Sequence, residues 1–238
     1  MLLRSALVAT TFGLFAGCGM LGGGSTDNGG DNNGGGGGGS DTSQMMLDSA
    51  KGQPTQYIMQ LPPNPKVGMW WEHTASGTSM KYAITKAQDD KLVVEQEQDF
   101  GGTMLVNAWL VDPSVDTMAM PAEGEKMPAN VTKAWVGIKG KEAHERKVMD
   151  APVYKKTEGG QEVDYTEGDE QVKMAGKTWD AHWVESGESK TWTVKGTSFL
   201  LKSMYQGKVS MELKAVGGDA ETMLKWDGGK EEMKEEGK

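Results

Sequence analysis

The feature that most constrains the fold of this chain is a two-residue alternation of polar and apolar side chains. Near the end of the sequence Val209, Met211 and Leu213 alternate with polar residues, and Trp179 and Trp183 lie in a second alternating run. Successive side chains of a strand point to opposite faces of a sheet, so this pattern predicts strands with one buried face. Helix-period patterns are scarce by comparison.

Further strands are predicted wherever β-branched and aromatic residues gather between turn-forming residues. These segments are residues 91–99, 103–111, 131–138, 162–166 and 199–205. Gln206-Gly207 predicts a two-residue hairpin turn before the last alternating run. One short helix is expected over residues 43–51 with Ser43 as its N-cap. The predicted fold is mostly β: a single curved antiparallel sheet or open half-barrel with one or two short helices.

The N-terminus has the pattern of a secretory signal peptide. Arg4 supplies a positive charge, residues 6–15 form a short apolar stretch, and Ala16 and Gly17 precede Cys18. The apolar stretch is too short to remain as a membrane-spanning helix. We therefore predict that residues 1–17 are a signal peptide.

The segment Leu14-Phe15-Ala16-Gly17-Cys18 resembles the lipobox of bacterial lipoproteins. The resemblance implies cleavage before Cys18 and attachment of lipid to its sulfur and to the new amino terminus. Stable anchoring needs at least two acyl chains, and the lipoproteins of this class carry three. Gly19 is similar to the pattern of lipoproteins sorted to the outer membrane, so we expect a lipid-anchored protein of the cell envelope, on either side of that membrane.

Composition divides the rest of the chain into three parts. Residues 18–43 are rich in Gly, Asn, Asp and Ser, with six consecutive glycines from Gly34 to Gly39, and such a segment predicts a flexible linker. Residues 44–227 form the predicted antiparallel β domain. Residues 228–238 are a charged tail without apolar periodicity. Cys18 is the single cysteine, so an intramolecular disulfide is impossible.

The formal net charge of −9 bears on possible partners. Nucleic-acid binding needs clustered Lys and Arg, whereas the 25 basic residues here are interspersed among 34 acidic ones. We therefore expect no nucleic-acid partner, and membrane attachment through lipid rather than through charge.

No pattern of catalytic residues is evident. There is no Gly-x-Ser-x-Gly segment, and no Gly-Lys-Ser/Thr follows the glycine runs into a helix as a phosphate-binding loop requires. The three histidines, His73, His144 and His182, lack metal-ligand spacing. We predict a protein that is not an enzyme, with no cofactor and no His-based metal site. A weaker possibility is a Cu(I) site of thioethers, for which the candidates are Met118, Met120 and Met127.

Eight tryptophans in a chain with only four phenylalanines are unusual, and the candidate ligand-binding residues are six of these tryptophans. Trp70 and Trp71 are adjacent on an expected strand, so they point to opposite faces. An apolar pocket is the functional interpretation of this surplus, and simple packing is the alternative. The candidates for the pocket are Trp70, Trp109, Trp135, Trp179, Trp183 and Trp192.

Residues 174–216 resemble the C-terminal half of the Lol-type lipoprotein carriers and receptors. The matching stretches are 174–179, 189–194, 199–202 and 208–215, and residues 67–72 look like the first long strand of that family. The resemblance implies a curved, unclosed half-barrel with helices or loops across its mouth. In the better-known members the concave side holds acyl chains.

These observations favour a membrane-anchored lipoprotein whose β domain binds an apolar ligand such as an acyl chain or a lipoprotein, without catalysing a reaction. The alternative is a structural or interaction lipoprotein of the envelope that has a packed core and no small-molecule ligand. The methionine-based copper binder remains as the third hypothesis.

Overall fold

The computed structural model describes residues 39–100, 102–156 and 164–226, and for residues 39–41 it describes the backbone alone. The predicted signal peptide with Cys18, most of the predicted linker and the charged tail lie outside the described residues. Within the described part, no helix combines the length and hydropathy that a membrane span requires.

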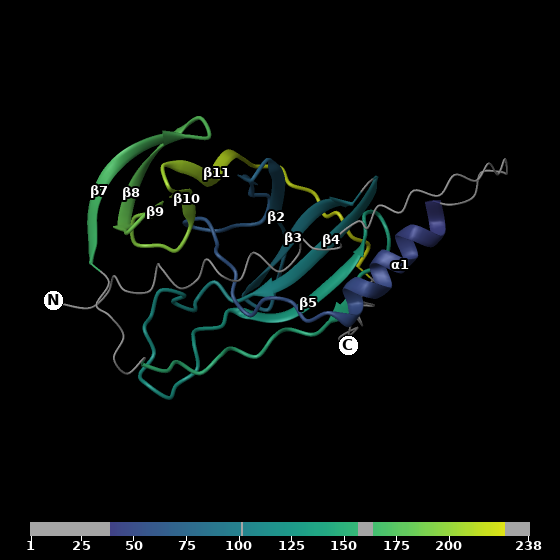
Figure 1. Cartoon of the computed structure of the whole chain (residues 1–238). Helices are drawn as coiled ribbons and strands as arrows, with labels where there is room; N and C mark the ends of the chain where they lie inside the picture. Colours follow the sequence, from purple (N-terminus) through teal and green to yellow (C-terminus); the bar gives the residue numbers. More distant parts are fainter. Residues whose placement is uncertain (1–38, 101, 157–163, 227–238) are drawn as a thin grey trace, which may run out of the picture.

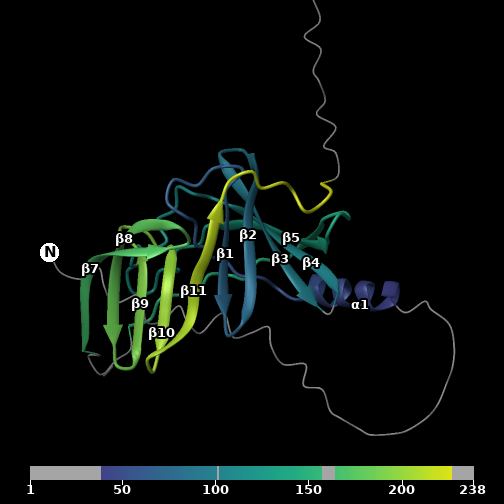
Figure 2. The same ribbon diagram turned by 90° about the horizontal axis from the view of Figure 1, so that it is seen from above.

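Eleven antiparallel strands form one open sheet that does not close into a barrel (Figures 1 and 2). The strands are β1 (Trp70–Ala75), β2 (Thr78–Gln88), β3 (Lys91–Phe100), β4 (Thr103–Val111), β5 (Val131–Ile138), β6 (His144–Arg146), β7 (Tyr165–Met174), β8 (Lys177–Ser186), β9 (Ser189–Val194), β10 (Leu200–Tyr205) and β11 (Lys208–Gly217). Their spatial order is β6-β5-β4-β3-β2-β1-β11-β10-β9-β8-β7. The predicted fold class is therefore confirmed.

Most strand predictions agree with the structure, and the one hairpin turn predicted in detail is confirmed. Gln206 and Gly207 have φ values of 51° and 73°, the left-handed backbone that a two-residue turn between antiparallel strands requires. Strand β7 begins at Tyr165 and continues to Met174, well beyond the predicted 162–166 segment. Because most of its side chains are exposed and several are acidic, β7 lacks the alternation of apolar and polar residues that predicts a strand with one buried face.

Three clusters of apolar side chains stabilise the sheet. The largest lies on one face, where Trp71, Ile84 and Trp109 of the first strands meet Leu213 of β11 and Phe199, which directly precedes β10. Because both halves of the strand order contribute to this cluster, burying it joins them into one cooperative unit.

Residues 219–226, which we call the C-terminal strap, cover the opposite face of β3–β5. Leu224 of this strap is only 2% exposed and packs against Val93 and Val106 of the sheet. Backbone hydrogen bonds attach the strap at several points, including Ala220 N–H to the Gly68 carbonyl at 2.8 Å. Strands β3–β5 are thus covered on both faces, by the main core on one side and by the strap on the other.

The helix begins earlier than the sequence indicated. Helix α1 spans Gly39–Gly52 and places Leu47, 4% exposed, against Leu105 and Val136 of the sheet. The prediction of Ser43 as its N-cap was wrong, because Ser43 lies inside the helix and its hydroxyl is 2.8 Å from the Thr103 hydroxyl. A contact with the sheet, rather than a local cap, thus occupies this side chain.

Candidate functional site

The six candidate tryptophans do not gather around one cavity. Trp109 is 3% exposed in the main core and donates its indole N–H to the Thr55 hydroxyl at 3.0 Å. Trp179 packs on the same cluster, 6.1 Å from the Phe199 ring. Trp135 belongs to the cluster under the strap, where it meets the Trp226 ring edge-on at 5.0 Å.

Two of the remaining tryptophans lie flat on a glycine of the neighbouring strand. Trp183 covers Gly168, where a Cβ atom would come within 2.9 Å of the indole, and Trp70 covers Gly217 in the same manner. A lysine ammonium lies over each ring: Lys190 is 3.9 Å from the centre of Trp183, and Lys81 is 4.7 Å from that of Trp70. Each of these two rings is thus covered by a glycine on one face and by a lysine ammonium on the other, so both faces are already in contact with the protein.

Trp192, the sixth candidate, lies beside Trp183. It pairs with Trp183 across β8 and β9, and Lys190 lies near both rings. Its indole N–H donates to the Glu170 carboxylate at 2.5 Å. The structure therefore brings Trp183 and Trp192 together in the sheet surface. None of the six candidates lines either of the two hollows described below, so a pocket lined by several of them stays a prediction.

A cavity of about 250 Å³ lies elsewhere, between three loops. The loops are residues 59–65, residues 113–118 and the turn 196–198 before β10. The cavity has an apolar part formed by Met59, Leu61, Pro62, Pro65, Val115 and Met118. None of the six candidate tryptophans lines it.

The residues of the apolar part connect this cavity to the main core. Met59 is 4% exposed and belongs to the core cluster, and Leu61 packs against that cluster. Buried Asn130 fixes the Met59 backbone, since its amide accepts from the Met59 N–H at 2.7 Å and donates to the Met59 carbonyl at 2.8 Å. The floor of the cavity is thereby held by the core, as a preformed binding site requires.

Polar groups close the rim. The Thr117 and Ser198 hydroxyls are 2.9 Å apart and join loop 113–118 to the turn before β10. That turn is itself closed by the Thr197 hydroxyl, which donates to the Val194 carbonyl at 3.0 Å. Hydrogen bonds thus tie these loops to each other and to the sheet, which limits their freedom to rearrange.

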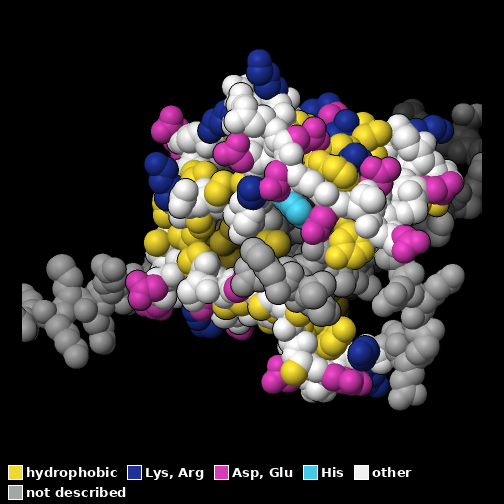
Figure 3. Space-filling view, turned by 90° about the vertical axis from the view of Figure 1, so that its left-hand side faces the viewer, with side chains coloured by type: hydrophobic (Ala, Val, Ile, Leu, Met, Phe, Trp, Pro, Cys, Tyr) yellow, Lys and Arg dark blue, Asp and Glu magenta, His cyan; other side chains and the backbone are white. Residues whose placement is uncertain are grey.

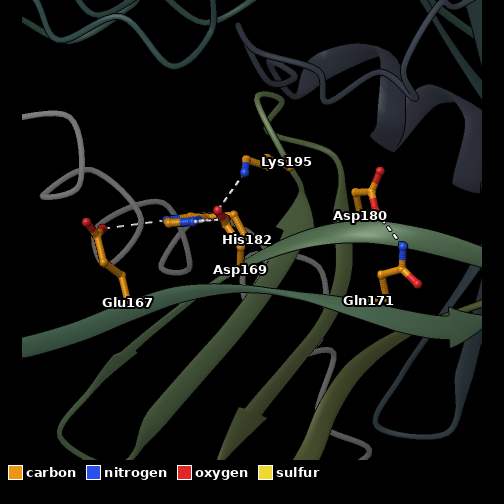
Figure 4. Close-up of polar contacts among 6 residues, drawn as sticks. All are labelled: Glu167, Asp169, Gln171, Asp180, His182 and Lys195. Atoms are coloured by element: carbon orange, nitrogen blue, oxygen red, sulfur yellow. Dashed lines mark hydrogen bonds and ion pairs between the residues drawn. The ribbon is translucent and has the colours of Figure 1, made fainter.

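A charged network on β7 and β8 holds the strand end that leads into this turn (Figure 4). Lys195 is the last residue before the turn, and its ammonium donates to Asp169 at 2.6 Å. Asp169 also lies 3.0 Å from His182, whose other ring nitrogen is 3.5 Å from Glu167. Gln171 and Asp180 lie further along the same strands, joined at 3.3 Å.

This network perturbs two of its members. Hydrogen bonds from Lys195 and then His182 lower the pKa of Asp169, and the hydrogen bond and charge of Asp169 raise the pKa of Lys195. Figure 3 shows a histidine set among acidic side chains on this side of the molecule, beside a hollow with hydrophobic side chains. A shallow hollow of about 270 Å³ adjoins Asp169, Asp180 and Lys195. The charges here are solvent-exposed, which makes the network a modest structural element.

Within the described residues, no group of three His, Cys, Asp or Glu side chains is placed to hold a metal ion. Met118 lines the loop cavity, but Met120 and Met127 do not. The copper hypothesis therefore stays a prediction.

The loop cavity escaped sequence analysis because it has no periodic signal. Its walls come from three loops and from Asn130, all far apart in the chain, and the only local sign is proline, at Pro62, Pro63, Pro65 and Pro113. Proline marks loops but does not say which loops meet.

Comparison of the chain with known protein families, curated proteins and solved structures finds no match. The resemblance to the Lol-type carriers thus remains a prediction made from residues 67–72 and 174–216.

Proposed function

We propose that this protein is a lipid-anchored lipoprotein of the bacterial cell envelope, sorted to the outer membrane, whose β domain binds an apolar ligand without catalysing a reaction. The observation that carries the binding proposal is the loop cavity, with its floor of Met59 and Leu61 on the main core. Lipid on Cys18 and the linker that follows would keep this cavity near a membrane.

The size of the cavity limits the ligand. An apolar cavity of roughly 150 Å³ accepts a benzene molecule, and typical small-molecule sites begin at about 300 Å³. The loop cavity of about 250 Å³ is open to solvent and has polar groups beside its apolar part, so it would hold at most one ring or the end of an acyl chain, with the rest of the ligand outside. A ligand held by one end is compatible with an acyl chain or an acylated protein.

The binding proposal is tested with N-phenyl-1-naphthylamine, an uncharged probe that fluoresces in apolar surroundings. A Cys18→Ser chain removes the proposed lipid site and leaves every described residue unchanged. We expect saturable binding, which Val115→Trp abolishes by filling the cavity. The control is Val209→Trp on β11, 45% exposed and outside the cavity, which should bind as the parent chain does. Equal binding by both variants would refute the assignment of the site.

The anchor is tested separately in bacteria fed an alkyne-bearing fatty acid. The full-length chain should acquire the label, and the Cys18→Ser chain should not. Label on both chains, or on neither, would contradict lipidation of Cys18.

One observation favours the alternative, an interaction lipoprotein without a small ligand. The tryptophans that suggested an apolar pocket lie in packing positions, on glycines or in the core. Failure of every apolar probe to bind, in a chain that unfolds cooperatively, would leave this alternative as the better proposal.

A further inference from the structure

The polar part of the loop cavity carries a single kind of charge. Among the described residues that line the cavity, Asp116 is the only ionisable one. The other polar side chains are neutral, and they include Asn64, Ser114, Thr117 and Ser198. A ligand that enters this cavity therefore meets one carboxylate and no cation.

The Asp116 carboxylate is held in place by its own loop. One of its oxygens accepts the Met118 N–H at 2.9 Å, and its backbone carbonyl accepts the Ala119 N–H at 3.2 Å. The second carboxylate oxygen has no partner among the hydrogen bonds found in the described part of the chain. Asp116 likewise takes part in none of the ion pairs found there.

The cations nearest in sequence to the cavity do not offset this charge. Lys195 precedes the turn 196–198, but its ammonium lies 2.6 Å from Asp169 in the network on β7 and β8. Lys66 follows Pro65 and is exposed, and it is not among the residues that line the cavity. The net charge of −9 adds a long-range attraction for cations and a repulsion for carboxylates.

We propose that the ligand of this cavity carries a cationic ammonium group next to its apolar part, and that Asp116 selects for that group. This inference rests on the proposed function, because it concerns the same cavity. The apolar part would lie on Met59 and Leu61, and the ammonium would lie at Asp116. The Thr117 and Ser198 hydroxyls offer further acceptors at the rim, as an ammonium with three N–H groups requires.

The test compares three probes of equal chain length: dodecylamine, dodecanol and dodecanoate. Each is used below its micelle concentration at pH 7 and low salt to displace N-phenyl-1-naphthylamine from the Cys18→Ser chain. An exposed ion pair changes affinity by up to about fivefold. We expect dodecylamine to bind up to about fivefold more tightly than dodecanol, and dodecanoate to bind most weakly.

Asp116→Asn should remove the advantage of dodecylamine and leave dodecanol unchanged. The amide oxygen of Asn can still accept the Met118 N–H, so the loop keeps its conformation. The control Asp89→Asn changes the net charge equally, in the β2–β3 turn and outside the cavity, and should keep the preference.

The outcomes separate the two proposals. Equal affinities for the three probes, or a preference that survives Asp116→Asn, would overturn the assignment of an ammonium ligand while binding of dodecanol keeps the proposed function. A preference lost equally in Asp89→Asn would assign it to net charge and also overturn the role of Asp116. Displacement by none of the probes, in a chain that does not bind the naphthylamine either, would refute both proposals.

Discussion

Replacing Glu95 should weaken the attachment of the C-terminal strap to the sheet. The Glu95 side chain is fully buried on β3 and accepts three hydrogen bonds, all from the strap: from the Thr222 hydroxyl at 2.9 Å, the Met223 N–H at 2.5 Å and the Trp226 indole N–H at 3.0 Å. The carboxylate is therefore the polar centre of an otherwise apolar interface.

Two limits bound the cost of Glu95→Ala. If the strap stays in place, the Met223 N–H loses its acceptor, at about 1–3 kcal/mol. The Thr222 hydroxyl can still donate to the Leu224 carbonyl, and the Trp226 indole N–H to the Thr222 hydroxyl. If the strap detaches, the cost becomes the lost burial, about 1.5–3 kcal/mol for Leu224 and less for the partly buried Trp226. The chain follows the cheaper route, so we expect a loss of about 1–3 kcal/mol and a strap that opens more often.

Denaturant unfolding and trypsin cleavage measure the two effects separately. The midpoint of unfolding should fall, and cleavage after Lys225 should become fast under native conditions. The control is Glu97→Gln, two residues along the same strand, where the carboxylate forms an ion pair with Lys139 and is 17% exposed. We expect that variant to lose less than about 1 kcal/mol. If Glu95→Ala lost as little, and the strap stayed resistant to trypsin, our account of the strap would be refuted.

The other predictions concern a buried histidine and a tryptophan-covered glycine. His73 is 6% exposed among aromatic rings, and burial lowers its pKa although a hydrogen bond to the Leu200 carbonyl opposes the shift. The unfolded chain therefore binds a proton near pH 6.5 while the folded chain does not, so stability should be full above that pH and fall by up to about 1.4 kcal/mol per unit below it. His73→Phe should flatten this acid dependence in urea titrations at pH 5 and pH 8, and an unchanged slope would show that another group causes it. Gly168→Val places a side chain where Trp183 lies within 2.9 Å of the glycine's would-be Cβ, so we expect a loss of about 1–3 kcal/mol in thermal unfolding. The double variant Gly168→Val, Trp183→Ala should lose less than the sum of the two single changes, and strict additivity would contradict the contact.

The sequence predicts those elements of the fold that depend on short-range signals. Strands β4 and β5 appear with the expected bounds because β-branched and aromatic residues gather there between turn-forming residues. Strand β7 was largely missed because its side chains are exposed and charged, so neither face carries an apolar pattern. The start of α1 was misplaced because Ser43 bonds to Thr103, a contact between residues 60 positions apart.

The site was harder to predict than the fold for the same reason. The abundance of tryptophan is visible in the sequence, but the glycines beneath Trp70 and Trp183 become visible only when the strand register is known. The cavity depends on three loops whose meeting is fixed by contacts such as Thr117 with Ser198, 81 positions apart. Met118 was noted for its sulfur, and in the structure it forms part of an apolar wall.

The strand order has a consequence for how the molecule assembles and how it would come apart. Along the sheet, neighbouring strands follow each other in the chain on both sides of a single junction, the pairing of β1 with β11. Strands β1–β6 and strands β7–β11 can thus each form by successive addition of a neighbouring strand, and each addition costs less loop-closure entropy than a pairing distant in sequence. The β1–β11 junction closes the longest loop, so we expect it to form late. A bulge at Glu72/His73 interrupts the backbone hydrogen bonds between β1 and β11. If a stretching force pulls β1–β6 away from β7–β11, we expect these hydrogen bonds to break first.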